Sequence, residues 1–475
     1  MSDVSLSAEN NSASITSTKM NANPKIAVGY AFGEIGCQMS WYMINNYLTL
    51  FYTDIVGLSS VAISLIMVIA RVWDAVNDPM MGSIADRTNT RWGRFRPYLF
   101  FAPPFLAIFN ILTFTIWPMT GLVKILVCLV CYLGTGMAYT ACSIAYQAMQ
   151  NVIAVDSRVR MLLATCRNLG ASVIGIILSI VAAPTLLKLS HPGVAAADAQ
   201  GYFRFAIIIS LVMLIPFWLC AILCKEKYTD VLHANKGKAE QLNFFSAMKE
   251  ISKNDQLLMV VLTVILGTIC VSGRMGLLTY YVIYVVGDFS HIPYFFTVMT
   301  VAQLVGSLSL PWGTNTFTKK GYLIILQLLM NAGFLAMFLL PHAGIPALLG
   351  ISAVCGFCNS AQGICYGLVG DSLEYGDWKL GRRQEGVAAS MLSFGVKIAT
   401  ALCGSVGVLL LAAVGYVPNA DQTEAARQGI NALVNLLPFV VGVISLIPML
   451  FYKLTPDKIE EIRTDLENGV RAYEK

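Results

Sequence analysis

The chain has 475 residues, of which 56% are hydrophobic and 12% are charged, and its mean hydropathy is +0.67. Because soluble domains carry roughly 25% charged residues, this composition excludes an ordinary soluble enzyme or binding module and indicates a polytopic membrane protein. The formal net charge of +5 comes mostly from loop lysines and arginines, so we expect no nucleic-acid partner.

Apolar stretches long enough to cross a bilayer, about 20 residues each, recur along the chain. The twelve predicted helices span roughly residues 26–53, 58–82, 98–118, 122–150, 160–187, 202–224, 257–287, 292–313, 321–341, 344–370, 386–416 and 429–452. The longest polar segment, residues 225–256, divides them into two sets of six. We therefore expect an all-α protein with two six-helix bundles, residues 25–224 and 257–452, and two tails, residues 1–24 and 453–475.

Lysine and arginine are concentrated in alternate short loops, in the central loop and in both tails. Since such residues favour the cytoplasmic side, both termini are expected to be cytoplasmic and the protein to lie in the plasma membrane. The first 23 residues are rich in Ser and Asn and lack an apolar core, which is typical of a disordered tail and not of a signal peptide. The twelve cysteines lie almost entirely in apolar segments and are expected to pack as small buried residues.

The second predicted helix carries Arg71, Asp74, Asn77 and Asp78 within its apolar run. Residues at i, i+3 and i+7 share a helix face, and ionisable groups at membrane depth indicate an ion or substrate pathway. Carboxylate, amide and hydroxyl oxygens suit a hard cation, so we predict a cation site formed by Asp74, Asn77, Asp78 and, from the fourth helix, Thr140. The alternatives are that Arg71 only neutralises Asp74, or that the two carboxylates share a proton. The predicted cofactor is therefore only a coupling cation: Na⁺, Li⁺ or H⁺.

Polar and aromatic side chains repeat along one face of the first helix at Gln38, Trp41, Tyr42 and Asn45. Such faces bind sugar hydroxyls and cover sugar C–H faces, although single members could instead hydrogen-bond to neighbouring helices. Further sugar-site candidates lie on other helices: Ser143, Gln147, Arg167, Gln362, Ser393 and Lys397. Lys397 is the strongest of these, because a lysine near the middle of a helix reaches water with difficulty.

Dense charge at the ends of the second and tenth helices suits a gate whose ion pairs form in one state and break in another. The predicted gating residues are Asp86, Arg87, Arg91, Arg94, Asp371, Glu374 and Glu385. Fixing the membrane orientation or forming an ordinary solvated loop would explain the same charges.

Several segments together resemble one family. They are Phe51-Tyr52-Thr53-Asp54-Ile55-Val56-Gly57-Leu58, Ala70-Arg71-Val72-Trp73-Asp74-Ala75-Val76-Asn77-Asp78-Pro79, Arg91-Trp92-Gly93-Arg94-Phe95-Arg96-Pro97, Glu374-Tyr375-Gly376-Asp377-Trp378-Lys379 and Gly415-Tyr416-Val417-Pro418-Asn419. In this order and at these helix ends, they resemble the glycoside-pentoside-hexuronide:cation symporters, which include the melibiose permease and the glucuronide carrier. The resemblance implies the major facilitator fold, with two bundles that rock around a central site.

The resemblance also implies roles. Asp74, Asp78, Asn77 and Thr140 match the family's cation-site positions, and Arg167 and Lys397 match basic residues of its sugar site. The chain departs from the melibiose permease at a second set of positions: Cys37, Gln38, Ser143, Gln147 and Gln362. Because the carboxylates that hold galactosyl hydroxyls are missing, we expect an anionic or neutral pentoside or hexuronide and not an α-galactoside.

The predicted function is therefore cation-coupled symport of a glycoside, pentoside or hexuronide by a monomer whose other partner is membrane lipid. One alternative is a carrier of lysolipids or other amphiphiles, which would need an apolar slot open to the bilayer. Another is a non-transporting membrane sensor, which would need a sizeable soluble domain. We expect no enzyme, because no nucleophile-base pair or metal motif appears in the sequence.

Overall fold

The computed structural model describes residues 24–153, 157–194, 196–226, 254–381, 385–418, 420–468 and 470–471. Within these ranges the chain is helical and contains no β-strand. The helices of the first half are α2 (Pro24–Leu50), α3 (Ser60–Arg87), α4 (Arg96–Thr113), α5 (Gly121–Ile153), α6 (Ser157–Leu189) and α7 (Ala199–Leu223). The helices of the second half are α10 (Asp255–Tyr280), α11 (Ile292–Phe317), α12 (Lys319–Leu339), α13 (Ile345–Asn359), α14 (Gln362–Leu380), α15 (Glu385–Ala413), α16 (Glu424–Asn431), α17 (Leu437–Phe451) and α18 (Pro456–Glu467).

Ten helical segments in the described part of the chain are long and apolar enough to cross a membrane. Two of these segments each contain two α-helices, α13 with α14 (Ile345–Leu380) and α16 with α17 (Glu424–Phe451). The other two predicted spans correspond to α2 and α4, of 27 and 18 residues. The all-α, membrane-spanning fold predicted from the sequence is therefore confirmed.

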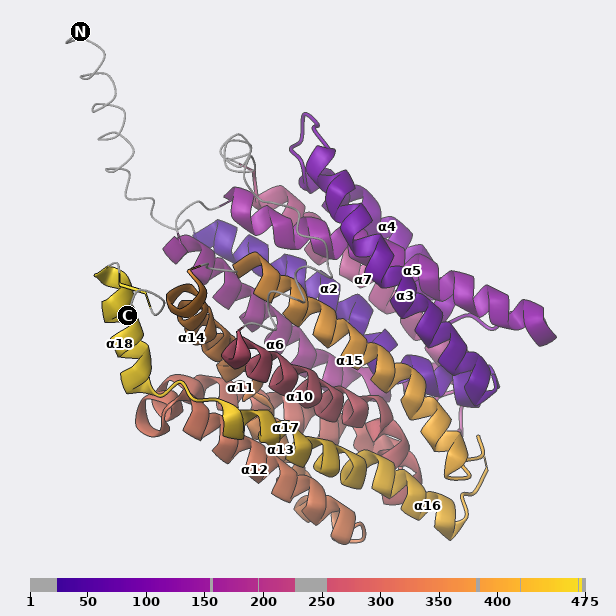
Figure 1. Cartoon of the computed structure of the whole chain (residues 1–475). Coiled ribbons are helices and arrows are strands. Elements are labelled where there is room, and N and C mark those ends of the chain that lie inside the picture. The colour runs from indigo at the N-terminus through magenta and orange to yellow at the C-terminus, as the bar shows by residue number, and fades with distance from the viewer. Residues whose placement is uncertain are drawn as a thin grey trace.

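The helices pack mainly within their own half of the chain. The two halves meet where α3 lies against α15, α6 against α11 and α2 against α10. In Figure 1, α3 and α15 can be followed side by side, although they come from opposite halves of the sequence. Ten of the twelve cysteines are buried and the other two half-buried, and all are free thiols, as the packing role requires.

The first residues of α2 and the helix α18 lie on the same side of the molecule (Figure 1). We call this side the terminal face and the other side the opposite face. The last helix, α18, was expected only as part of a tail, but it packs against α14. Arg463 of α18 reaches Glu374 (Nε to Oε2, 2.7 Å), and the Trp378 indole N–H donates to Asp465 (3.0 Å).

The first helix of each half ends in the same way at the opposite face. A π-helical turn, Phe51–Ile55, follows α2, and another, Tyr281–Val286, follows α10. Each is followed by a glycine with a left-handed backbone, Gly57 at φ +70° and Gly287 at φ +98°, a conformation that costs glycine little. Because a π turn inserts an extra residue into the helix, it rotates the side chains that follow it. These turns set the direction of the Asp54 and Tyr284 side chains.

Candidate substrate and cation site

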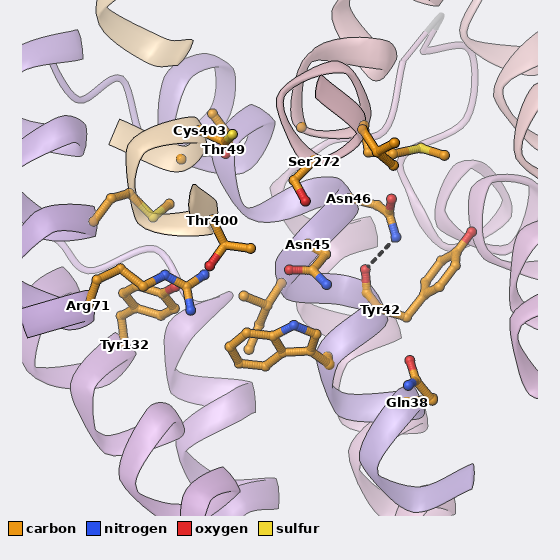
Figure 2. Close-up of a pocket in the computed structure, with 17 residues that line it drawn as sticks. Gln38, Tyr42, Asn45, Asn46, Thr49, Arg71, Tyr132, Ser272, Thr400 and Cys403 are labelled. Atoms are coloured by element: carbon orange, nitrogen blue, oxygen red, sulfur yellow. Dashed lines mark hydrogen bonds between the residues drawn. The ribbon is translucent and has the colours of Figure 1, made fainter. Parts of the chain in front are cut away.

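A cavity of about 410 Å³ lies between the two halves of the chain. Its lining side chains come from α2, α3, α5, α10 and α15: Gln38, Trp41, Tyr42, Ile44, Asn45, Asn46, Thr49, Met67, Arg71, Tyr132, Val271, Ser272, Met275, Gly276, Thr400, Cys403 and Gly404. We call it the central cavity. Figure 2 shows Gln38 and Asn45 of α2 on one side and Arg71 on the other. Ligand sites typically measure roughly 300–1,000 Å³, so the central cavity has room for a small sugar.

The four polar residues predicted on the first helix all line the central cavity. The Tyr42 hydroxyl is buried and has no hydrogen-bond partner among the described residues. Gln38 donates its amide N–H to Glu34 (2.9 Å), a membrane-depth carboxylate that the sequence pattern did not single out.

Arg71 and Trp41 form a fixed unit at the cavity wall. The guanidinium carbon of Arg71 lies 5.6 Å from the centre of the Trp41 ring, and that ring stacks on Tyr139 at 4.6 Å. Arg71 also pairs with Asp74, with Nη1 3.5 Å from Oδ2. Because a guanidinium has five N–H donors, Arg71 keeps donors for a ligand in the central cavity.

The two carboxylates of α3, Asp74 and Asp78, lie next to positions of α5 that are one helical turn apart. The Thr140 hydroxyl donates to Asp78 Oδ1 at 3.0 Å. One turn away on α5, Gly136 lies so close to Asp74 that a β-carbon at this position would be only 3.2 Å from Oδ1. Asn77 is buried, and its amide nitrogen has no partner in the described part of the chain. Oxygens of Asp74, Asp78 and Thr140 therefore lie in one region between α3 and α5 and are of the type that a hard cation prefers.

Lys397, the strongest sugar-site candidate from the sequence, lies at the contact between α15 and α3. It does not line the central cavity but forms a short ion pair with Asp78 Oδ2 across the contact between α15 and α3. A buried or half-buried ammonium is stabilised by the nearest carboxylate, and helix packing brings Asp78 within its reach. Arg71 and Lys397 thus balance Asp74 and Asp78, so this cluster carries no net formal charge. The assignment of Lys397 to the sugar site therefore stays a prediction, and in this structure the charge of Lys397 is paired with that of Asp78.

The remaining sugar-site candidates also lie outside the lining of the central cavity. Ser143 is buried, Arg167 is half-buried, and Gln147, Gln362 and Ser393 are exposed. Arg167 and Gln362 lie on α6 and α14, which contribute no residue to the lining, so their helix faces alone could not predict their place. The second half of the chain instead contributes residues that the sequence pattern did not identify, among them Ser272 and Thr400. Their only sequence signal is a small polar group within an apolar helix.

Arg274 of α10 is another charged residue at membrane depth, and it points away from the central cavity. It is 1% exposed, and its guanidinium contacts Met337 Sδ (3.0 Å) and the Phe334 ring (5.0 Å). Its Nε has no hydrogen-bond partner in the described residues. Arg274 therefore belongs to the core of the second half.

At the opposite face the two halves are joined by hydrogen bonds. Asp54 accepts from the hydroxyls of Tyr284 (2.6 Å) and Tyr416 (2.5 Å), and the hydroxyls of Thr53 and Tyr280 are 2.9 Å apart. We call these five residues the tyrosine seal. They lie between the central cavity and the opposite face, so the structure is closed on that side.

The charged residues predicted to act as a gate lie at the terminal face. Asp371 pairs with Lys319 (2.7 Å), and Glu374 pairs with Arg463, so both are engaged within the second half. The backbone N–H of Arg94 donates to Glu226 (2.8 Å), while Arg87 and Arg91 are exposed. The side chains of Asp86 and Glu385 lie outside the described part of the structure. The ion pairs of Asp371 and Glu374 thus stay within the second half, whereas the tyrosine seal joins the two halves.

Two helical halves around a polar cavity, with ionisable side chains at membrane depth, define a secondary transporter of the major facilitator fold. The chain belongs to the MFS/sugar transport protein family, whose model matches residues 29–456.

Three relatives cover most of the chain and agree with the resemblance drawn from the sequence. The isoprimeverose transporter of Lactiplantibacillus pentosus is 28% identical, covering 92% of this chain and 90% of its own length. The glucuronide carrier protein homolog of Escherichia coli (strain K12) is 27% identical, covering 94% and 96%. The inner membrane symporter YicJ of the same organism is 26% identical, covering 95% and 96%. The family predicted from the sequence is thereby confirmed.

A solved structure supports the fold independently. The crystal structure of a D-xylose-proton symporter superposes with a TM-score of 0.60 at 12% identity, covering 91% of this chain and 98% of that one.

Proposed function

We propose that this protein is a cation-coupled symporter that carries a glycoside, pentoside or hexuronide through the central cavity by alternating access. The observation that carries the proposal is the position of Asp74, Asp78 and Thr140 beside that cavity, with Lys397 from the other half held on Asp78. A group that binds a cation and also joins the two moving halves can couple ion binding to their motion.

The charge balance indicates how coupling works. In the described structure the Lys397 ammonium occupies one oxygen of Asp78 and neutralises it. A Na⁺, Li⁺ or H⁺ that binds to Asp78 must displace Lys397, which frees an ammonium at the contact between α3 and α15. The cluster then carries one net positive charge, which an anionic hexuronide in the central cavity would compensate through Arg71. A neutral glycoside would leave that charge to cross with the loaded carrier.

The orientation of the protein in the membrane identifies the side on which the described state is closed. The lysine and arginine distribution supports placing the terminal face in the cytoplasm of a plasma membrane. The tyrosine seal then closes the extracellular side, so the described state is closed outward. With a neutral substrate, the one cation charge that crosses 100 mV contributes about 2.3 kcal/mol, which sustains an accumulation of about 50-fold.

The lining of the central cavity argues against the lysolipid alternative. Gln38, Asn45, Asn46, Ser272 and Thr400 place amides and hydroxyls around the space. An acyl chain buried there would leave these groups without hydrogen bonds, which costs free energy for each of them. A hydroxylated sugar would satisfy them.

The test is uptake into proteoliposomes with Na⁺ and pH gradients imposed separately. Labelled glucuronides, xylosides and galactosides are offered in turn, and we expect one of the first two classes to accumulate under one of the gradients. Asp78→Asn is expected to bind sugar and exchange it but not to accumulate it. Accumulation without any ion gradient would contradict cation coupling. Full accumulation by Asp78→Asn would show that this carboxylate does not couple transport.

A further inference from the structure

A second cavity, of about 430 Å³, opens on the outer side of the first half, near the terminal face. Its lining residues are Trp92 from the loop before α4, Arg96, Phe100 and Phe101 from the start of α4, and Trp218 from α7. We call it the aromatic recess. It shares no lining residue with the central cavity, so transport does not explain it.

The rings of the aromatic recess are held in place although they are open to the outside. Trp92 stacks on Phe101, with ring centres 5.6 Å apart and planes inclined by 12°. The Trp218 indole N–H donates to the backbone oxygen of Phe100 at 3.1 Å. Trp92, Phe101 and Trp218 are nevertheless 41%, 58% and 38% exposed. These contacts preform the recess, so a ligand need not supply the free energy to order it.

The surroundings of the aromatic recess show what covers it. Exposed apolar side chains continue from it along both helices, with Phe105 and Ile108 on α4 and Leu211 and Ile215 on α7. In a membrane-spanning protein such a face lies against acyl chains. Tryptophans gather where acyl chains give way to headgroups, and Trp92, in the loop before α4, and Trp218, near the end of α7 at the terminal face, are placed accordingly.

The polar end of the aromatic recess is basic. Arg96 donates Nε to the backbone oxygen of Ala221 (2.8 Å) and Nη1 to that of Trp92 (3.3 Å), which fixes the guanidinium and leaves other N–H donors for a ligand. Arg91 lies 5.6 Å over the Trp92 ring. No salt bridge involves either arginine within the described ranges.

The carboxylate beside this loop does not neutralise the arginine side chains. Glu226 accepts hydrogen bonds from three successive backbone N–H groups, those of Arg94 (2.8 Å), Phe95 (2.7 Å) and Arg96 (2.8 Å). Both its oxygens are therefore engaged at the start of α4. An excess of positive charge remains at the mouth of the aromatic recess.

We propose that the aromatic recess binds one anionic phospholipid from the leaflet at the terminal face. The lipid phosphate lies against the guanidinium groups of Arg96 and Arg91, and the upper part of an acyl chain lies along Phe101 and Trp218. A guanidinium matches a phosphate in both charge and hydrogen-bond geometry. A phosphatidylcholine headgroup would fit the apolar part equally well, but it would add an ammonium next to two arginines.

The test is native mass spectrometry of the purified full-length protein in an equimolar mixture of phosphatidylglycerol and phosphatidylcholine. The wild type is expected to retain one phosphatidylglycerol in clear preference to phosphatidylcholine. Arg96→Gln should reduce that preference about fivefold, since one arginine at an anionic surface contributes roughly this factor. Arg204→Gln is the matched control, because Arg204 is an exposed arginine near the other end of α7, the helix that carries Trp218.

Two results would overturn the proposal. One is equal retention of the two lipids by the wild type, a measurement that requires no variant to fold. The other is an equal loss of preference in Arg96→Gln and Arg204→Gln, which would indicate a diffuse electrostatic attraction instead of a site. Arg96→Lys separates charge from geometry, and we expect it to keep part of the preference because it retains the charge but loses the guanidinium fork.

Discussion

Replacing Asp54 by Asn should weaken the tyrosine seal without removing any atom from its framework. Asp54 accepts from Tyr284 at 2.6 Å and from Tyr416 at 2.5 Å, and both bonds join the two halves. Hydrogen bonds to a charged acceptor contribute about 1.5–3 kcal/mol each, against about 1 kcal/mol for neutral pairs. The substitution therefore removes about 2 kcal/mol from the closed state, which shifts the balance towards the outward-open state by about 30-fold.

A native thiol reports this shift. Cys403 lines the central cavity and is half-buried, whereas most other cysteines are buried. A thiol reagent that cannot cross the membrane is added to the opposite face of oriented vesicles, and the rate of Cys403 labelling is followed. In the wild type the tyrosine seal blocks access, so labelling should be slow; in Asp54→Asn it should rise by about the factor given above.

Two controls isolate the effect. Cys403→Ser in the Asp54→Asn background should abolish the added labelling, which excludes the other half-buried thiol, Cys166. Asp288→Asn removes an exposed carboxylate near the same face whose described partners, the Ser290 N–H (2.8 Å) and the His291 ring (3.4 Å), both lie within three residues of it, and it should leave the rate unchanged. If Asp54→Asn labels no faster than the wild type, the seal does not hold the two halves together.

Three further predictions concern the cation cluster. Lys397→Met removes the ammonium that competes for Asp78, so the apparent Na⁺ or H⁺ affinity measured by equilibrium titration should rise about 5- to 30-fold, corresponding to about 1–2 kcal/mol; a lower affinity in a folded variant would contradict the competition. Gly136→Ala places a carbon about 3.2 Å from Asp74 Oδ1 and should weaken cation binding several-fold while sugar binding persists. Gly267→Ala serves as the control, because a β-carbon there meets no atom within 4 Å. Equal effects of the two substitutions would indicate altered helix packing and not a change at the cation site. Asp74→Asn leaves Arg71 without its partner, so we expect lost cation-driven accumulation with exchange retained in counterflow assays, and undiminished accumulation would remove Asp74 from the coupling site.

Local sequence patterns predict which residues share a helix face and which segments span the membrane. Arg71 and Asp74 were expected on one helix face, and their 3.5 Å contact follows from the i, i+3 spacing alone. The stripe of Gln38, Trp41, Tyr42 and Asn45 was found for the same reason, and all four line the central cavity. Apolar length predicted the membrane spans, because the thickness of a bilayer fixes how long such a helix must be.

Local sequence patterns do not predict the contacts between helices. Helical periodicity states which residues share a face but not which other helix that face meets, nor at what height. Lys397 was therefore assigned to the sugar site, although its partner Asp78 lies 319 positions earlier in the chain. The tyrosine seal is not predicted by the sequence pattern for the same reason, since Asp54 and Tyr416 are 362 positions apart.

The sequence by itself thus determined that this protein crosses a membrane many times and carries acidic and basic groups on one buried helix face, since both depend on local spacing and on the cost of charge in lipid. Only the tertiary structure decided that Asp78 is shared between Thr140 and Lys397 and that Asp54 joins two tyrosines from the other half. These pairings depend on how the two halves dock, and docking is set by side-chain packing over whole helix surfaces instead of by any short motif.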